Sequence, residues 1–254
     1  MTNSETGSPA RVAIVTGGSG GIGRAVSERL AADGISVLVH YAGNPVRAEE
    51  VVKVITSAGG AAVAASADVA DEGEVSALFD QAEQQFGGVD VVVHTAGILL
   101  LAPLAELKLD DLDRLHRTNI RGTFVVAQQA ARRVRAGGAI INFSSSVVKI
   151  ALANYTAYAA SKGAVDAITL ILAKELRGRD ITVNAVAPGP TATPFSSRAR
   201  TRARLTASPT WHRLSVSARH KTSPRPSHFS PARPAGSTAR SSTPTAASSE
   251  PSPR

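Results

Sequence analysis

The chain has 254 residues, no cysteine and a formal net charge of +8. This length allows one α/β domain with a substantial core, and the lack of cysteine excludes disulfides and thiolate metal sites. The first ten residues are polar and no segment is apolar for long enough to span a bilayer, so we expect neither a signal peptide nor a membrane span, with a cytoplasmic location as the default.

The positive charge is confined to the C-terminal part of the chain. Residues 196–254 hold ten Arg and one Lys against one Glu, which gives +10, whereas residues 1–195 hold 17 basic and 19 acidic side chains, which gives −2. The tail is rich in Ser, Pro, Thr and Ala and lacks hydrophobic periodicity, which is typical of disorder. We therefore expect a flexible N-terminus over residues 1–10, a folded domain over 11–195 and a disordered basic tail over 196–254.

The first predicted element is a short strand of β-branched residues at 12–15. It leads into the glycine-rich segment TGGSGGIG at 16–23, and a helical pattern continues to Leu30. Two glycine patterns fit this segment, GxGxxG from Gly18 and TGxxxGxG from Thr16. A strand, glycine turn and helix in this order can receive a pyrophosphate on backbone N–H groups, although glycine turns also serve packing alone.

A second strand at 35–39 is followed by the neutral segment His40-Tyr41-Ala42-Gly43-Asn44. An NAD site normally has an acid here to bind the ribose 2′-hydroxyl, and none occurs before Glu49. A neutral edge with Arg24 or Arg47 nearby better accommodates a 2′-phosphate. We therefore expect NADP(H) to be favoured over NAD(H).

The rest of the domain alternates strands and helices. Further strands are predicted at residues 61–67, 89–94, 139–143 and 181–186, and helices at 47–58, 71–86, 107–134 and 158–176. Such alternation predicts βαβ units with right-handed crossovers, and hence an α/β fold with a three-layer, doubly wound parallel sheet. Ligands of such sheets bind at the carboxyl ends of the strands, where the candidate chemical groups fall.

Tyr158 and Lys162 stand four residues apart in the segment YAASK and would share one face of a helix. A phenol has an ordinary pKa near ~10, and a nearby cation stabilises the phenolate, so Tyr158 is a candidate general acid or base. Tyr155 competes for this role, but the residue four positions later is Ala159. The alternative interpretation of the pair is a half-buried tyrosine beside a solvated lysine.

Several motifs in this order resemble the short-chain dehydrogenase/reductase family, in particular single-domain reductases similar to 3-oxoacyl-[acyl-carrier-protein] reductase. The resemblance covers residues 11–195. It rests on TGGSGGIG, Asp68-Val69, HTAG at 94–97, Asn119, the serines at 144–146, YAASK and PGPTAT at 188–193. It implies a Rossmann fold and hydride transfer between NAD(P)(H) and a carbonyl or alcohol.

The resemblance also implies a role for each catalytic position. Tyr158 would donate the proton, Lys162 would lower its pKa and hold the nicotinamide ribose, and Ser145, thirteen residues before the tyrosine, would hold the carbonyl oxygen. Asn119 would anchor a water in the proton relay to Lys162. Together with the glycine turn and the edge of the second strand, the expected cofactor-binding residues are Gly17, Ser19, Gly21, Ile22, Gly23, His40, Tyr41, Asn44, Asp68, Val69, Ala96, Gly97, Tyr158, Lys162, Pro188, Gly189 and Thr191.

One departure from the family lies in the cofactor floor, where HTAG stands in place of NNAG. The family's asparagines brace the neighbouring backbone, so we expect their replacement to loosen the site without abolishing it. A metal role for His94 is not expected, because no partner ligands accompany it.

The resemblance ends after Phe195. Translation shifted by one base over residues 211–248 permits a segment that resembles the family's closing part, including its last strand and its A-N-G-G end. We therefore hypothesise a one-base shift between the codons for Phe195 and Trp211, which resequencing would test. A chain of this kind would lack the last strand and the closing helix, and we expect its turnover to be weak or absent.

The expected partners are a small carbonyl or alcohol substrate and further copies of the chain, in a dimer or tetramer formed by helices 107–134 and 158–176. No membrane partner is expected. Two alternatives remain. One is a pseudoenzyme that binds nucleotide without chemistry, and the other is a binder of nucleic acid or an acidic partner through the tail. Nucleic acid is the weaker hypothesis, because Trp211 and Phe229 are the tail's only large aromatic residues and no recognition motif accompanies them.

Overall fold

The computed structural model describes residues 10–190 and contains one six-stranded sheet in the order β3-β2-β1-β4-β5-β6. All neighbouring strands are parallel, which confirms the predicted doubly wound α/β fold. The strands are β1 (Val12–Thr16), β2 (Ser36–Tyr41), β3 (Ala62–Ser66), β4 (Val89–His94), β5 (Val134–Phe143) and β6 (Thr182–Val186). The expectations for the N-terminus, for Thr191, for the basic tail and for a missing last strand and closing helix fall on residues outside the described part.

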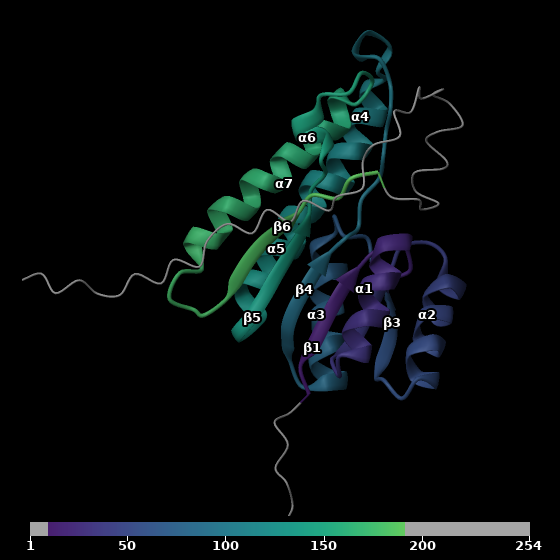
Figure 1. Cartoon of the computed structure of the whole chain (residues 1–254), viewed down its shortest axis with the longest axis vertical. Helices are drawn as coiled ribbons and strands as arrows, with labels where there is room; N and C mark the ends of the chain where they lie inside the picture. The colour runs from purple at the N-terminus through teal and green to yellow at the C-terminus, as the bar shows by residue number, and fades with distance from the viewer. Residues whose placement is uncertain (1–9, 191–254) are drawn as a thin grey trace, which may run out of the picture. The chain divides into compact units, whose positions relative to one another are not determined.

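Helices connect the strands and cover both faces of the sheet (Figure 1). They are α1 (Gly21–Ala32), α2 (Pro45–Ser57), α3 (Glu72–Phe86), α4 (Leu109–His116), α5 (Gly122–Arg133), α6 (Val147–Ile150) and α7 (Thr156–Glu175), with a short 3₁₀ turn, η1 (Leu104–Glu106). No helix within residues 10–190 combines the length and the apolar character that a membrane crossing needs.

The predicted helix at 107–134 is interrupted by a π-helical turn, η2 (Arg117–Arg121), between α4 and α5. It also ends one residue earlier than expected, because Val134 already belongs to β5 and pairs with Val89. The register of this pairing shifts between Val89 and Val91, and Gly137 within β5 has a φ of +79°. This irregularity explains why only the regular part of β5, from Ala139, was predicted from the sequence.

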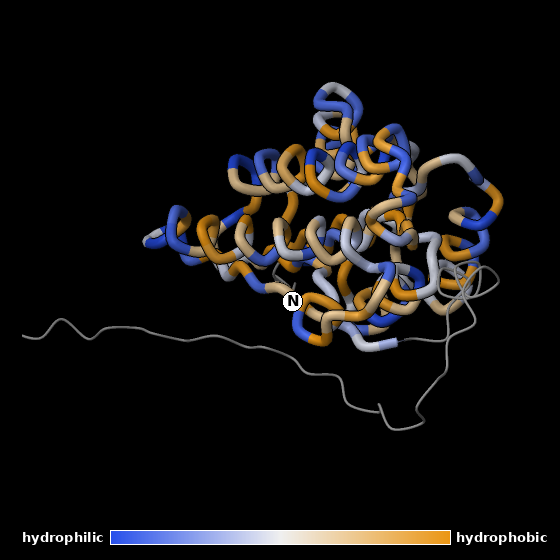
Figure 2. The backbone as a smooth tube through the Cα atoms, turned by 90° about the horizontal axis from the view of Figure 1, so that it is seen from above, coloured by the Kyte–Doolittle hydropathy of each residue, from blue (hydrophilic) through white to orange (hydrophobic). Residues whose placement is uncertain are grey.

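Each face of the sheet has its own hydrophobic core. β1 and β4 are buried along their whole length, as expected for central strands covered on both sides. One face packs against α3, α5 and α7 through residues such as Phe79, Val126 and Leu172, and the other packs against α1 and α2 through Ala31 and Val51. Hydrophobic and hydrophilic residues alternate along the helices in Figure 2, which is typical of helices that cover a core on one side.

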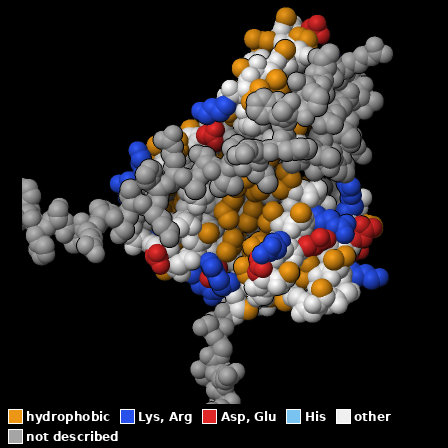
Figure 3. Space-filling model, viewed as in Figure 1, with side chains coloured by type: hydrophobic (Ala, Val, Ile, Leu, Met, Phe, Trp, Pro, Cys, Tyr) orange, Lys and Arg blue, Asp and Glu red, His pale blue; other side chains and the backbone are white. Residues whose placement is uncertain are grey.

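The face packed by α1 and α2 is less covered over β5 and β6. Ile141, Phe143 and Val186 are only half-buried there, although Ile141 and Phe143 pack against the core of this face. Figure 3 shows hydrophobic side chains gathered in the middle of this view, near the labels of β4 and β6 in Figure 1. This partly open sheet face contrasts with the closed one behind it.

A buried carboxylate ties three strands together at the opposite end of the sheet from the predicted site. Asp90 accepts a hydrogen bond from the Val12 N–H at 2.7 Å and pairs with Arg135, whose Nε lies 2.8 Å from Oδ1. Hydrogen bonds from Arg135 and Val12 hold the pKa of Asp90 below its ordinary value, although partial burial opposes them. β1, β4 and β5 are thereby fixed to one another.

Candidate active site

The glycine turn after β1 is built so closely that side chains do not fit. Gly17 has a φ of +67°, and a Cβ there would lie 3.0 Å from the backbone N of Ala96. A Cβ on Gly23 would lie 2.2 Å from the carbonyl oxygen of Gly17. The turn therefore sits directly on the loop after β4, and only glycine allows this approach.

The N-terminus of α1 is open to a ligand in a way that α2 and α3 are not. The side chain of Asn44 caps α2, with Oδ1 3.0 Å from the Val46 N–H, and Asp71 caps α3 in the same manner. Gly20, at the start of α1, offers no side-chain cap, and the first turn of this helix contains no acidic residue. Uncapped N–H groups at a helix N-terminus suit a pyrophosphate, so the turn fits the phosphates of a dinucleotide. Ser19, Gly21 and Ile22 are accessible at its mouth.

His40 lies beneath this turn and not at the open edge. Its Nδ1 accepts a hydrogen bond from the Gly17 N–H at 2.9 Å, so the ring proton is on Nε2, which donates to the carbonyl of Ala67 at 2.9 Å. The side chain is 1% exposed, and burial lowers its pKa. His40 is thus a neutral brace that supports the turn. The accessible groups of this edge belong to Tyr41, which is half-buried, and Asn44, which is exposed.

The floor formed by HTAG is tied to β1 by hydrogen bonds of its own, without the family's asparagines. Thr95 donates through Oγ1 to the carbonyl of Thr16 at 2.6 Å, and the Ala96 N–H donates to Thr16 Oγ1 at 3.3 Å. Thr16 Oγ1 also lies 2.7 Å from Nδ1 of His94. Threonine at 95 supplies a short side-chain bond to a neighbouring carbonyl, and this bond provides the bracing.

His94 is buried and stays neutral. Burial, and then the charge of Lys162, lower its pKa to about 3. Its Nε2 has no hydrogen-bond partner in the described part of the chain. No group of three His, Cys, Asp or Glu that could hold a metal occurs within residues 10–190.

Asp68 and Val69 follow β3 and approach the helix that carries Asn119. Asp68 accepts a hydrogen bond from the Ala70 N–H at 2.9 Å and forms an ion pair with Arg117. Partial burial raises the pKa of Asp68, but these two bonds outweigh it and hold the pKa below the ordinary value. Val69 is buried against Gly122, where a Cβ would lie 2.8 Å from the Val69 side chain.

Tyr158 lies in the first turn of α7 with Ser145 beside it. The phenol is 8% exposed, and its ring packs edge-on against Tyr155 at a centroid distance of 6.3 Å. Burial raises the pKa of Tyr158 to about 12, although a hydrogen bond with the Ser145 side chain opposes the shift. Lys162 makes no resolved contribution to this shift in the polypeptide alone, so the lowering of the Tyr158 pKa by the lysine stays a prediction.

Lys162 is the least exposed cation at the site. Its side chain is 6% exposed, and Nζ donates to the carbonyl of Phe143 at 2.6 Å while lying 5.9 Å from the centre of the Tyr158 ring. Burial lowers its pKa to about 8, and the nearby Asp166 opposes this only in part. The lysine therefore holds its charge at neutral pH in a poorly solvated position.

Asn119 joins the floor to α7 from the π-helical turn. Its Oδ1 accepts from the Ile98 N–H at 2.8 Å, and its Nδ2 donates to the Ile98 carbonyl at 2.9 Å and to Ser161 Oγ at 3.1 Å. A Cβ on Gly97 would lie 3.1 Å from Asn119 Oδ1 and 3.7 Å from Lys162 Nζ. The side chains of Asn119 and Lys162 thus both lie against Gly97.

The three serines after β5 have different surroundings. Ser144 is buried, and its hydroxyl lies 3.4 Å from the carbonyl of Lys162. Ser145 is half-buried beside the phenol, and the Ser146 N–H donates to the carbonyl of Pro188 at 3.0 Å. The last bond places Pro188 and the adjoining Gly189 next to the serines.

The structure thus gathers Ser145, Tyr158, Lys162 and Asn119 at the carboxyl ends of the central strands, beside the glycine turn. Sequence reasoning missed Ser161, which receives the Asn119 bond and donates to the Tyr158 carbonyl at 2.8 Å. Its position inside YAASK was the only available signal. It also missed Arg117, because the sequence does not show that the fold brings this arginine next to Asp68.

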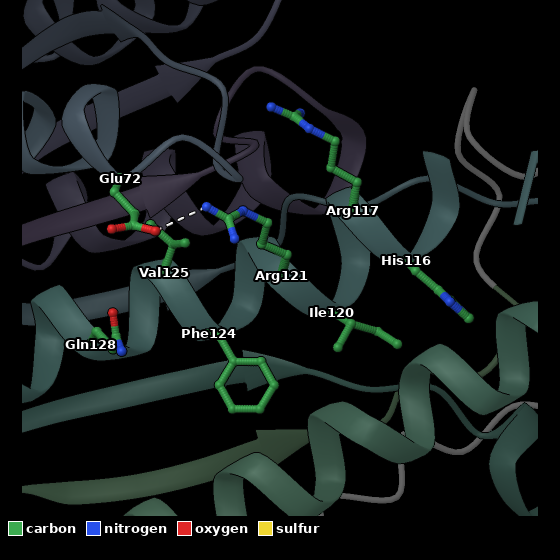
Figure 4. Close-up of a pocket in the computed structure, with 8 residues that line it drawn as sticks. All are labelled: Glu72, His116, Arg117, Ile120, Arg121, Phe124, Val125 and Gln128. Atoms are coloured by element: carbon green, nitrogen blue, oxygen red, sulfur yellow. Dashed lines mark hydrogen bonds and ion pairs between the residues drawn. The ribbon is translucent and has the colours of Figure 1, made fainter. Parts of the chain in front are cut away.

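A shallow hollow of about 510 Å³ lies on the α4 to α5 helix, outside the group of predicted catalytic residues (Figure 4). In that view Arg117 and Arg121 extend to one side of the helix and Phe124 to the other. It is lined by Glu72, His116, Arg117, Ile120, Arg121, Phe124, Val125 and Gln128. None of these residues is a predicted catalytic group.

Comparisons with known proteins agree with this geometry. A model of the short chain dehydrogenase family matches residues 11–204. A short-chain type dehydrogenase/reductase of Picea abies is 45% identical over 193 residues, which cover 72% of this chain and 71% of the relative. An NADPH-dependent aldehyde reductase 2 of Arabidopsis thaliana chloroplasts is 42% identical over 198 residues, covering 72% of this chain and 73% of that protein.

Solved structures show the same likeness. A short chain dehydrogenase from Burkholderia cenocepacia in complex with NADP superposes with a TM-score of 0.70 at 42% identity, covering 73% of this chain and 76% of the other. A dehydrogenase/reductase from Sinorhizobium meliloti gives 0.71 at 39% identity, covering 73% and 74%. With its parallel sheet, its glycine turn and its Ser145, Tyr158 and Lys162, the chain belongs to the short-chain dehydrogenase family of oxidoreductases.

Proposed function

We propose that the chain is built to bind NADP(H) and to transfer hydride between it and a small ketone or the corresponding alcohol. One observation carries the proposal: the buried Tyr158 and Lys162 and the half-buried Ser145 lie together beside a glycine turn that is too closely packed to admit side chains at Gly17 and Gly23. Gly17, Ser19, Gly21, Ile22 and Gly23 would hold the pyrophosphate. Asp68, Val69, Ala96, Gly97, Pro188, Gly189 and Thr191 remain proposed cofactor contacts.

The preference for NADP(H) is supported by the end of β2. Its accessible residues Tyr41 and Asn44 are uncharged, and Arg47 is exposed in the first turn of α2. A 2′-phosphate there would meet the exposed cation of Arg47, and the first turn of α2 contains no acidic residue. The Arabidopsis relative is described as NADPH-dependent, and the Burkholderia structure contains NADP.

The protonation states favour the reductive direction. When bound, the nicotinamide supplies the hydride. A phenol with a pKa of about 12 keeps its proton at neutral pH, so Tyr158 can donate it to a carbonyl oxygen. Ser145 would hold that oxygen by a hydrogen bond, and Lys162 would stabilise the phenolate left behind. In our proposal the hydrogen bonds of Asn119 hold the loop after β4 and α7 in fixed positions, so that a proton relay to Lys162 can form.

A 3-oxoacyl group or another small ketone fits the apolar surroundings of the phenol. Leu99, Leu100, Val147 and Tyr155 pack around Tyr158 and are only partly buried. The exposed Phe124, Leu170 and Ile171 on α5 and α7 support assembly into a homo-oligomer through these helices. We expect weak or absent turnover in this chain, since the match to the family model ends at residue 204 of 254.

The first test is a calorimetric titration of the purified chain with NADPH and then with NADH. Tighter binding of NADPH supports the proposal, whereas tighter binding of NADH contradicts the interpretation of the β2 edge. Binding of neither refutes the proposed function for this chain. Binding without reduction of any ketone in a substrate panel would instead support a nucleotide-binding pseudoenzyme.

A further inference from the structure

The π-helical turn η2 carries two arginines that reach across to the loop between β3 and α3. Arg117 pairs with Asp68, which lies 49 positions earlier in the chain. Arg121 donates to the carbonyl of Ala70 at 2.9 Å and to Glu72 at 2.9 Å. Figure 4 shows both arginines extending from the helix on the same side, with Glu72 facing Arg121. The turn is thus fastened to the loop after β3. Ala67 of this loop donates its N–H to the carbonyl of Tyr41 at 3.2 Å, so the loop adjoins the end of β2, where the 2′-phosphate and hence the adenosine half of the cofactor are proposed to lie.

The loop itself is strongly acidic. Asp68 is followed within six residues by Asp71, Glu72 and Glu74, and Glu74 accepts a hydrogen bond from the Asp68 N–H at 2.7 Å. Such a cluster repels a phosphorylated ligand unless cations compensate it. Arg117 lies close enough for Asp68, Asp71 and Glu74 all to raise its pKa. Arg117 is therefore the cation that pairs directly with Asp68, while Arg121 pairs with Glu72.

The Asp68 side chain is held in one orientation by two bonds. The Ala70 N–H donates a hydrogen bond to Oδ1 at 2.9 Å, and Arg117 donates one to Oδ2. Both ionic partners are about half exposed, with side-chain exposures of 41% for Asp68 and 52% for Arg117. Exposed pairs of this kind add little to folding stability. The ion pair is therefore better explained by a role of the Asp68 carboxylate in ligand binding than by a contribution to folding stability.

We propose that Arg117 is a positioning residue for the adenosine half of the cofactor, which it serves by fixing the orientation and balancing the charge of Asp68. This inference rests on the proposed function. Arg117 does not need to touch the ligand. Its effect passes through the carboxylate, so it should disappear when that carboxylate is absent.

The test uses the full chain and two fragments of the cofactor in calorimetric titrations. 2′,5′-ADP represents the adenosine half and reduced nicotinamide mononucleotide represents the other half. We expect Arg117→Gln to weaken binding of NADPH and 2′,5′-ADP by about three- to tenfold and to leave the mononucleotide unchanged. Arg117→Lys should recover part of the loss. The matched control is Arg114→Gln. It also removes one positive charge from an ion pair, here with Asp111 within α4, and it should change none of these affinities.

A double-mutant cycle isolates the route through Asp68. Asp68→Asn should weaken 2′,5′-ADP binding by itself, and adding Arg117→Gln should weaken it no further. An NMR titration of the Asp68 carboxyl group in the free protein gives a second readout, since its pKa should rise in Arg117→Gln. The urea midpoint should stay unchanged in both single variants.

The outcomes separate this inference from the proposed function. If the unmodified chain binds neither NADPH nor NADH, both fail. If it binds NADPH but Arg117→Gln binds equally well, or if the two substitutions are additive, only the role of Arg117 is overturned. Equal weakening of both fragments would also overturn it, because that result indicates general damage to the groove.

Discussion

Burial of Lys162 at the proposed catalytic centre predicts that replacing it raises the folding stability and weakens cofactor binding. Burial lowers the pKa of Lys162 to about 8, against an ordinary value of 10.5. At neutral pH the folded protein therefore carries a charge in a place that disfavours it by about 3 kcal/mol. Replacing the lysine by Met removes this cost. It also leaves the Phe143 carbonyl without its donor, which costs about 1 kcal/mol. We expect Lys162→Met to be more stable than the unmodified chain by about 1–3 kcal/mol at pH 7 and to lose tight cofactor binding.

The pH dependence gives this prediction a sign. Below pH 8 the lysine is protonated in both the folded and the unfolded chain, and the full cost applies. Between pH 8 and 10.5 the folded state loses its proton first, so the unfolded state binds more protons and stability rises with pH. Lys162→Met should lack this rise.

The assay is urea unfolding followed by circular dichroism at pH 7 and pH 10, for the unmodified chain, Lys162→Met and Lys174→Met. Lys174 lies exposed on the same helix, so its replacement should change the unfolding free energy by less than about 0.5 kcal/mol. A Lys162→Met variant that is less stable at pH 7, or that shows the same rise toward pH 10, would refute the reasoning.

Four further predictions concern other parts of the domain. Asp90→Ala should lower the unfolding free energy by about 2–4 kcal/mol in urea titrations, and the contribution of Asp90 should be lost as pH falls below about 3.9 toward its lowered folded pKa. Gly23→Ala should abolish nucleotide binding in calorimetry, because a Cβ would lie 2.2 Å from the Gly17 carbonyl oxygen. Tyr158→Phe should reduce any measurable ketone turnover by at least about 100-fold while NADPH affinity stays the same. Ile141→Thr should slow aggregation in light-scattering measurements, because Ile141 lies half-buried on the partly open sheet face.

The strands and most helices could be predicted because local patterns determine them. The apolar runs of β1 and β4 are fully buried, and α2 and α3 begin at caps supplied by Asn44 and Asp71. The π-helical turn was not predicted, since residues 107–134 show one continuous helical pattern. Contacts from Arg117 and Asn119 to distant segments accompany the irregularity, and no local pattern encodes them.

The residues of the candidate site could be predicted from the sequence, but the direction of the Tyr158 pKa shift could not. Which groups lie near Tyr158 follows from the motifs, but the direction of its pKa shift depends on how deeply the ring is buried. The sequence places His40 directly after the predicted second strand at 35–39, which predicts a position at the open edge of the cofactor site. Its side chain instead lies under the glycine turn, where both ring nitrogens form hydrogen bonds with backbone groups. Strand position alone does not show which face such a side chain takes.

The π-helical turn gives the catalytic centre a dependence on residue count as well as on residue type. A π turn closes its hydrogen bonds one residue further along than an α-helix does, and one residue of α-helix corresponds to a rotation of about 100°. Leu115 on one side of the turn and Val126 on the other are both anchored in packed cores. Deleting Thr118 would let the turn close as ordinary α-helix, with Leu115 and Val126 still in their cores, but it would remove the extra residue that places Asn119 against Ile98. The position of Asn119 thus depends on the number of residues in this turn as well as on their identity.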